Sequence, residues 1–124
     1  MIKQQSIPIL GKFEVIKVEE FNPTSGQFET QFERMAITFT NSSIVMKSLE
    51  NSEGDNVVQN IREIYLQEET EQRKIFVLFD EDDSKILLIT PGKAIQSEMD
   101  KPRLMLFDDE LMTSGILFSL SRIL

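Results

Sequence analysis

The chain has 124 residues, of which 40% are hydrophobic and 27% charged, and its formal net charge is −8. This size and composition predict one soluble globular domain, and the lack of clustered Lys and Arg argues against binding to nucleic acid or anionic membranes. The absence of Cys and His removes disulfides, thiolate nucleophiles, zinc–sulfur sites and the commonest general base. No apolar run is long enough for a transmembrane helix and no signal peptide is recognisable, so we expect a cytoplasmic protein.

The chain begins with an expected arm over residues 1–10, in which Pro8 prevents regular strand pairing. A single domain over residues 11–124 follows. Residues 12–20 are rich in Val, Ile and Phe and predict a strand. The apolar positions within it change phase, from Phe13 and Val15 to Ile16 and Val18. Such a change predicts a β-bulge inside this strand.

Two apolar segments, 35–40 and 43–49, flank Asn41-Ser42 and predict a β-hairpin. Further strand-like segments follow, mostly separated by short polar turns: 62–69, 73–80, 85–90, 102–108 and 115–124. Regular spacing of this kind is typical of an antiparallel up-and-down meander. We therefore predict a mainly β protein in which about eight strands close into a small barrel.

Two segments also fit a helix. Apolar residues recur at helical spacing between Val57 and Tyr65, behind a potential cap at Asp55, and again between Met112 and Ile123. The alternative prediction is therefore an α+β fold whose sheet is closed by a helix at 55–69 or at 110–124.

The ends of the domain carry a recognisable arrangement. Gly11-Lys12-Phe13 opens the first long strand, and Arg122 lies in the last one. This arrangement resembles the lipocalins and related lipocalin-like (calycin-type) barrels, whose first strand begins with Gly-x-Trp and whose last strand places a basic residue over that ring. The chain departs from the pattern in having Phe in place of Trp, no Cys pair and a short length. The resemblance implies that Gly11, Phe13 and Arg122 are structural, with the guanidinium against the Phe13 ring closing one end of the barrel.

The resemblance also implies an apolar cavity that is open at the other end. The residues expected to contact a ligand there are Phe39, Met46, Tyr65, Phe76, Leu78, Leu88, Met105 and Leu106. The segments "KIFVLF" and "RLMLF" are apolar on both faces, so the pattern does not separate inward from outward side chains in them. It predicts that part of the outer surface is covered by a helix, by the arm or by another subunit.

Acidic side chains are the remaining candidates for chemistry. "DEDDS" at 80–84 has the first oxygen positions of a calcium loop, but Lys85 and Pro91 occupy the places of the required Gly and Glu. We expect a plain solvated turn without a metal. The doublets at 19–20, 68–69 and 108–109 cannot converge, because adjacent residues of a strand point to opposite faces. Without an activated nucleophile or a phosphate-binding loop, we expect no enzymatic activity and no cofactor.

Two functions suit such a chain. The first is a non-enzymatic lipocalin-like barrel that binds a small apolar ligand in its interior. The alternative is an acidic protein-interaction module, such as an immunity protein, an inhibitor or an anti-defence factor, that docks a basic protein partner or another copy of itself. A ligand binder hides its apolar surface inside, whereas an interaction module exposes an apolar patch.

Overall fold

A computed structural model describes residues 2–21, 34–49, 56–94, 100–107 and 115–123. Its strands are β1 (Ile2–Lys3), β2 (Gly11–Phe21), β3 (Met35–Phe39), β4 (Ser43–Ser48), β5 (Val57–Glu69), β6 (Arg73–Asp80), β7 (Lys85–Pro91), β8 (Arg103–Phe107) and β9 (Gly115–Arg122). Within these ranges, each strand from β2 to β9 pairs antiparallel with the next, and β9 pairs with β2. Eight described strands thus close into the predicted antiparallel up-and-down barrel, to which β1 is added.

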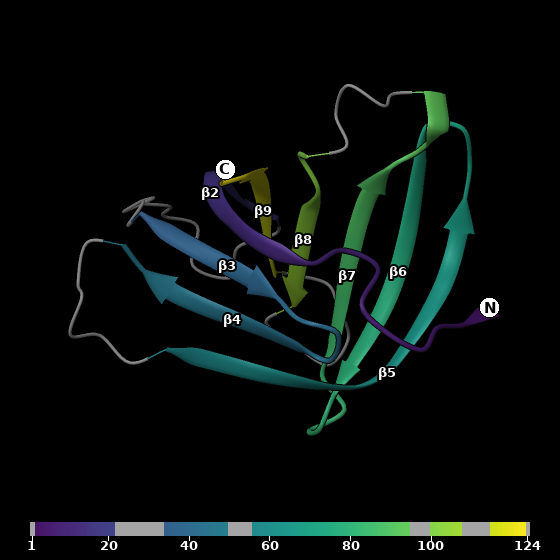
Figure 1. The fold of residues 1–124 in the computed structure, drawn as a ribbon, viewed down its shortest axis with the longest axis horizontal. Helices are drawn as coiled ribbons and strands as arrows, with labels where there is room; N and C mark the ends of the chain where they lie inside the picture. Colours follow the sequence, from purple (N-terminus) through teal and green to yellow (C-terminus); the bar gives the residue numbers. More distant parts are fainter. Residues whose placement is uncertain (1, 22–33, 50–55, 95–99, 108–114, 124) are drawn as a thin grey trace.

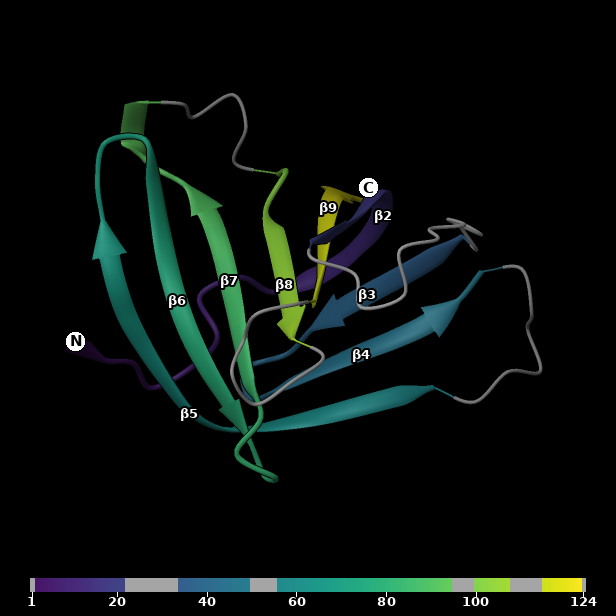
Figure 2. The ribbon, with the colours of Figure 1, turned by 180° about the vertical axis from the view of Figure 1, so that it is seen from behind.

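The barrel is strongly twisted. In Figures 1 and 2, β3, β4 and the first half of β5 run crosswise to β6 and β7. The long strand β5 joins the two groups by pairing with β4 through Val57–Asn60 and with β6 through Ile61–Glu69. Its second half leaves an edge beyond the end of β4, where β1 pairs with Tyr65 and Leu66. β1 therefore covers part of the edge of β5 along this half.

The helical alternative is wrong at both places: residues 57–69 and 115–122 are strands, while 110–114 lie outside the described residues. The register of β5 shifts between Ile61 and Glu63, within the helix-like pattern, and again between Leu66 and Glu68, after it. Each extra residue moves the following side chains to the opposite face, so inward residues are separated by three positions instead of two. No helix in the described ranges is long and apolar enough to cross a bilayer.

The local predictions for the first three long strands are confirmed. The pairing of β2 with β9 shifts between Val15 and Lys17, where the phase change predicted a bulge. The Asn41-Ser42 turn joins β3 to β4, and Phe39 lies directly opposite Ile44. The Thr40 hydroxyl stabilises this turn by accepting hydrogen bonds from the backbone N–H groups of Ser42 and Ser43.

The core fills the inside of the barrel. Inward side chains from β2 to β9 form one cluster with Ile7 of the N-terminal segment, which is only 2% exposed. The backbone N–H of Ile7 donates to Asn41 O, and that of Gln4 donates to Ile64 O. The first residues thus cross the barrel from β5 toward the start of β2 (Figure 1), and Ile7 contributes to the core.

Candidate functional site

One end of the barrel is sealed by an aromatic ring under a guanidinium. Phe13 at the start of β2 is fully buried, and the Arg122 guanidinium lies 4.6 Å from the centroid of its ring. Phe39 meets the same ring edge-on, with 5.6 Å between the ring centroids. The predicted contact of Phe13 with Arg122 is confirmed, and we call this region, defined by Phe13, Phe39 and Arg122, the sealed end.

Hydrogen bonds hold Arg122 in place over the ring. Its Nη1 donates to Leu10 O at 2.8 Å, and its Nε donates to the Asp100 carboxylate at 2.8 Å. Gly11 has a φ of 109°, and a Cβ atom there would lie 2.8 Å from Arg122 Nη1. Glycine is favoured at this position because any other residue would be strained at this φ and its Cβ atom would displace the Arg122 guanidinium.

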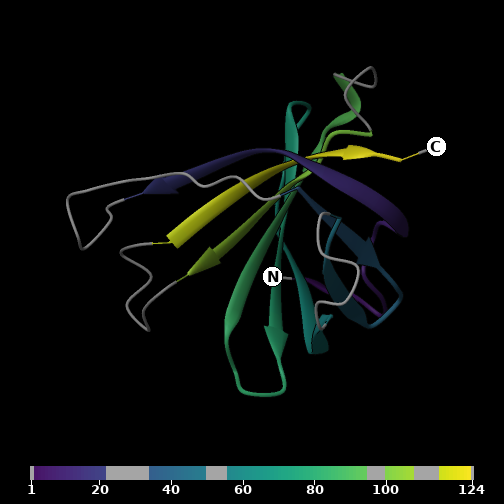
Figure 3. The ribbon, with the colours of Figure 1, turned by 90° about the vertical axis from the view of Figure 1, so that its left-hand side faces the viewer.

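The burial of the inward side chains changes along the barrel axis. The residues of the core cluster are at most 5% exposed. Two half-buried residues that also pack against this cluster, Ile9 and Leu66, belong to the N-terminal segment and to the half of β5 that pairs with β1. Toward the end opposite the sealed end, the inward apolar residues that contact the core are only half-buried: Val18, Met35, Met46, Ile61, Leu106 and Ile116. These six residues define what we call the far end. Figure 3 shows that the end of β2, the end of β8 and the start of β9 lie on the same side of the molecule.

Six of the eight expected ligand contacts lie on this interior surface. Phe39, Phe76, Leu78 and Leu88 belong to the buried core, whereas Met46 and Leu106 lie at the far end. The structure therefore brings these six together inside one barrel, and their contact with a ligand remains a prediction.

Tyr65 and Met105 do not face the interior. Tyr65 lies opposite Val77, which is buried outside the core cluster and alternates with the core residues Phe76 and Leu78. Met105 follows Leu104, whose side chain is in the core. Alternation alone could not assign these two positions, because the strand of Met105 is apolar on both faces and the register shifts in β5 interrupt the alternation around Tyr65. The pairing of the closed barrel assigns them to the outside.

The outer surface carries a continuous apolar row. Cross-strand pairing places its members side by side from β5 to β9: Tyr65, Val77, Leu87, Met105 and Leu117. The sequence predicted that part of the outer surface would be covered by a helix, by the arm or by another subunit. In the structure Val77 is 1% exposed and the other four residues of the row are half-buried. The structure shows that the row spans five neighbouring strands.

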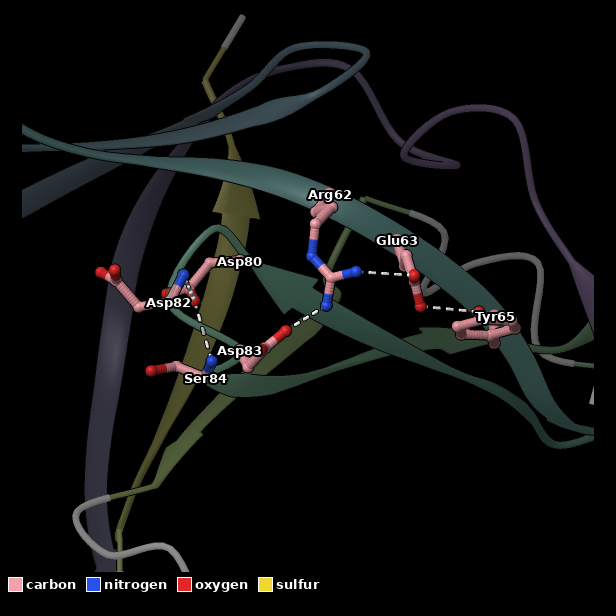
Figure 4. Close-up of polar contacts among 7 residues, drawn as sticks. All are labelled: Arg62, Glu63, Tyr65, Asp80, Asp82, Asp83 and Ser84. Carbon is pink, nitrogen blue, oxygen red and sulfur yellow. Dashed lines mark hydrogen bonds and ion pairs between the residues drawn. The ribbon is translucent and has the colours of Figure 1, made fainter.

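A polar network borders this row (Figure 4). Arg62, at the bulge of β5, donates to Glu63 Oε1 at 2.7 Å and forms an ion pair with Asp83. The Tyr65 hydroxyl donates to Glu63 Oε2 at 2.7 Å. This hydrogen bond is the main cause that lowers the pKa of Glu63 and raises the pKa of Tyr65. The hydroxyl of Tyr65 is thus engaged on the outer face.

The "DEDDS" segment forms the predicted turn between β6 and β7. Asp80 is 8% exposed, and its Oδ1 accepts hydrogen bonds from the N–H groups of Asp82 and Ser84. Asp83 takes a φ of 62° and pairs with Arg62. The Asp80 carboxylate thus stabilises the turn, and the part of the chain that the structure describes contains no cluster of three or more metal-ligating side chains. Of the acidic doublets, residues 108–109 lie outside the described residues.

The interior also holds one polar side chain that the sequence analysis did not single out. Gln59 on β5 lies directly opposite the fully buried Ile44 and therefore shares its inward face. Its Oε1 is buried, and within the described structure it has no hydrogen-bond partner. A polar residue two positions before the inward Ile61 was the available signal, but the competing helical pattern concealed it.

A scan against protein-family models and searches of curated proteins and of solved structures found no match to this chain.

Proposed function

We propose that this protein is a non-enzymatic container that binds a small apolar ligand inside the far end of its barrel. The observation that carries the proposal is the gradient of burial along the interior. Half-buried Met, Leu, Ile and Val side chains at the far end leave apolar surface accessible, and small-molecule sites are lined predominantly by such side chains. Met46 and Leu106 are the expected first contacts.

The sealed end supports a lipocalin-like assignment. A glycine with positive φ precedes a fully buried aromatic residue, and a guanidinium from the last strand covers its ring. In the proposed function these residues close one end of the barrel, so that a ligand enters only from the other. The sealed end then provides stability and leaves the far end to bind.

The proposal is tested by titrating an environment-sensitive apolar dye into the native protein. We expect saturable binding to the wild type and loss of binding in Met46→Trp, because the indole would fill the interior at the far end. Met105→Trp is the matched control: the same substitution on the outer face should leave dye binding unchanged. Thermal melts establish that both variants are folded.

Failure of the wild type to bind dye would refute the proposal. Equal loss of binding in both Trp variants would locate the dye on the outer surface or indicate a general disturbance of the fold.

A second candidate, docking of a basic protein partner, is favoured by the apolar row on the outer face together with the net charge of −8. Charge would accelerate the encounter, and the row would supply the buried contact. Native mass spectrometry of protein purified from its own host should then show a complex with a basic protein that Met105→Ser abolishes. A complex that persists in this variant would not use the row.

A further inference from the structure

The unpaired side-chain carbonyl oxygen of Gln59, Oε1, bears on the kind of ligand that the barrel interior would bind. A buried acceptor without a partner loses its hydrogen bonds to water and gains none in return. Buried polar groups in folded proteins are nearly always satisfied, so an exception requires an explanation. A hydrogen-bond donor on a bound ligand, which is not part of the polypeptide, would explain this unpaired acceptor.

Gln59 lies where such a donor would arrive. It shares the inward face of β5 with Ile61, one of the half-buried residues of the far end. The cross-strand neighbour of Gln59 is Ile44, an apolar residue of the core. The Gln59 amide is therefore a polar group at the border between the buried core and the accessible apolar surface.

The charged side chains around the far end also restrict the charge of the ligand group that carries the donor. Asp80 lies opposite Ile61, and Glu20 lies opposite Ile116, so both carboxyl groups are on the interior side of the rim. The guanidinium of Arg122 is at the sealed end and is already bonded to Leu10 and Asp100. An anionic head group at the far end would meet carboxyl groups there and no inward-facing cation among the described residues.

We infer that the ligand is a neutral amphipathic molecule, with an apolar body in the barrel interior and a hydroxyl or amide N–H that donates a hydrogen bond to Gln59 Oε1. This inference rests on the proposed function and refines it. It separates fatty alcohols and amides, which carry a neutral donor, from fatty acids, which carry a carboxylate at neutral pH.

The test is displacement of the apolar dye by three probes with the same chain: 1-decanol, methyl decyl ether and decanoate. For the wild type we expect decanol to bind about tenfold more tightly than the ether, the ratio that corresponds to one hydrogen bond. Decanoate should bind more weakly than decanol. In Gln59→Leu, the dye should still bind, but decanol and the ether should become equivalent.

Two further variants make the result specific. Gln59→Met, which keeps a flexible side chain of similar volume, should behave like Gln59→Leu. Asn60→Leu is the matched control, because Asn60 is the exposed neighbour on the same strand and should retain the decanol preference.

Dye binding without a decanol preference in the wild type, or a preference that survives in Gln59→Leu, would overturn the inference and leave a bound water as the partner of Oε1. Absence of dye binding in the wild type would instead remove the proposed function and this inference with it.

Discussion

The two ends of the barrel are built from similar apolar residues, but they differ in how deeply these residues are buried and in whether the nearby polar groups have hydrogen-bond partners. At the sealed end, Phe13 and Phe39 are buried and Arg122 has a hydrogen-bond acceptor on either side. At the far end, the apolar residues are half-buried and the Gln59 carbonyl oxygen has no partner within the described structure. The contrast indicates that the sealed end contributes more to the stability of the fold, and the far end is where we propose that a ligand binds.

The largest effect is expected from Phe13→Ala. It removes a fully buried ring and the face beneath Arg122, and it should lower the free energy of unfolding by about 3–5 kcal/mol. Denaturant unfolding measures this change. Ile16→Ala on the same strand is the control, because Ile16 is 53% exposed and should cost much less. Similar losses for the two variants would contradict the central role of the sealed end.

A matched pair of leucines measures the burial gradient directly. Leu88 is fully buried, whereas Leu106 is half-buried at the far end. Leu88→Ala should cost about 2–5 kcal/mol of unfolding free energy, and Leu106→Ala should cost about 1 kcal/mol because fewer contacts are lost. The same denaturant experiment compares the two variants. Equal costs would mean that the far end is as tightly packed as the core.

Gly11→Ala tests the backbone of the sealed end. A φ of 109° disfavours any side chain, and the new methyl group would collide with Arg122 Nη1. We expect a loss of about 1–3 kcal/mol in unfolding free energy. Repeating the change in an Arg122→Ala background separates the two causes, since only the collision disappears there. An identical loss in both backgrounds would attribute the whole effect to backbone strain.

The smallest change in stability is expected from Tyr65→Phe on the outer face, where the readout is a pKa. Removing the hydroxyl deletes the hydrogen bond that lowers the pKa of Glu63, so this pKa should rise toward the ordinary value of 4.5. NMR titration of the Glu63 carboxyl group follows the shift. Phe79→Leu is the control, because it removes the ring contact with Tyr65 but keeps the hydroxyl. An unchanged pKa in Tyr65→Phe would rule out this hydrogen bond.

The sign of the accompanying pH dependence follows from the lowered pKa. The folded protein holds the Glu63 carboxylate more strongly than the unfolded chain does. The resulting contribution to stability is complete above the ordinary pKa and is lost as the pH falls through the lowered value. Tyr65→Phe should therefore reduce the acid sensitivity that arises from this group.

Local patterns were sufficient to predict most of the strand order. Alternating apolar residues and polar turns located the long strands, and the phase change in residues 12–20 predicted the bulge that the structure places between Val15 and Lys17. The contact of Phe13 with Arg122 was predicted from a resemblance to known barrels. Periodicity alone could not have joined two residues from the first and last long strands.

Local patterns did not predict which side of a strand faces the barrel interior where both sides carry apolar residues or where a bulge interrupts the alternation. In 73–80 and 103–107 both faces are apolar, so the outward positions of Val77 and Met105 depended on the register of the closed barrel. In β5, the helix-like spacing concealed the inward position of Gln59. The docking of the N-terminal residues on β5 was also not predicted, because it depends on an edge that exists only once β5 has bent away from β4.

By itself, the sequence determined where strands and turns form, since alternation, β-branched residues and turn residues act over a few positions. It also determined the overall acidity and the absence of Cys and His chemistry. Only the tertiary structure decided which side of each doubly apolar strand faces inward, how burial varies along the interior and which polar atom is left unpaired. These properties depend on pairings between residues far apart in the chain, and no local pattern records the register of a barrel before it closes.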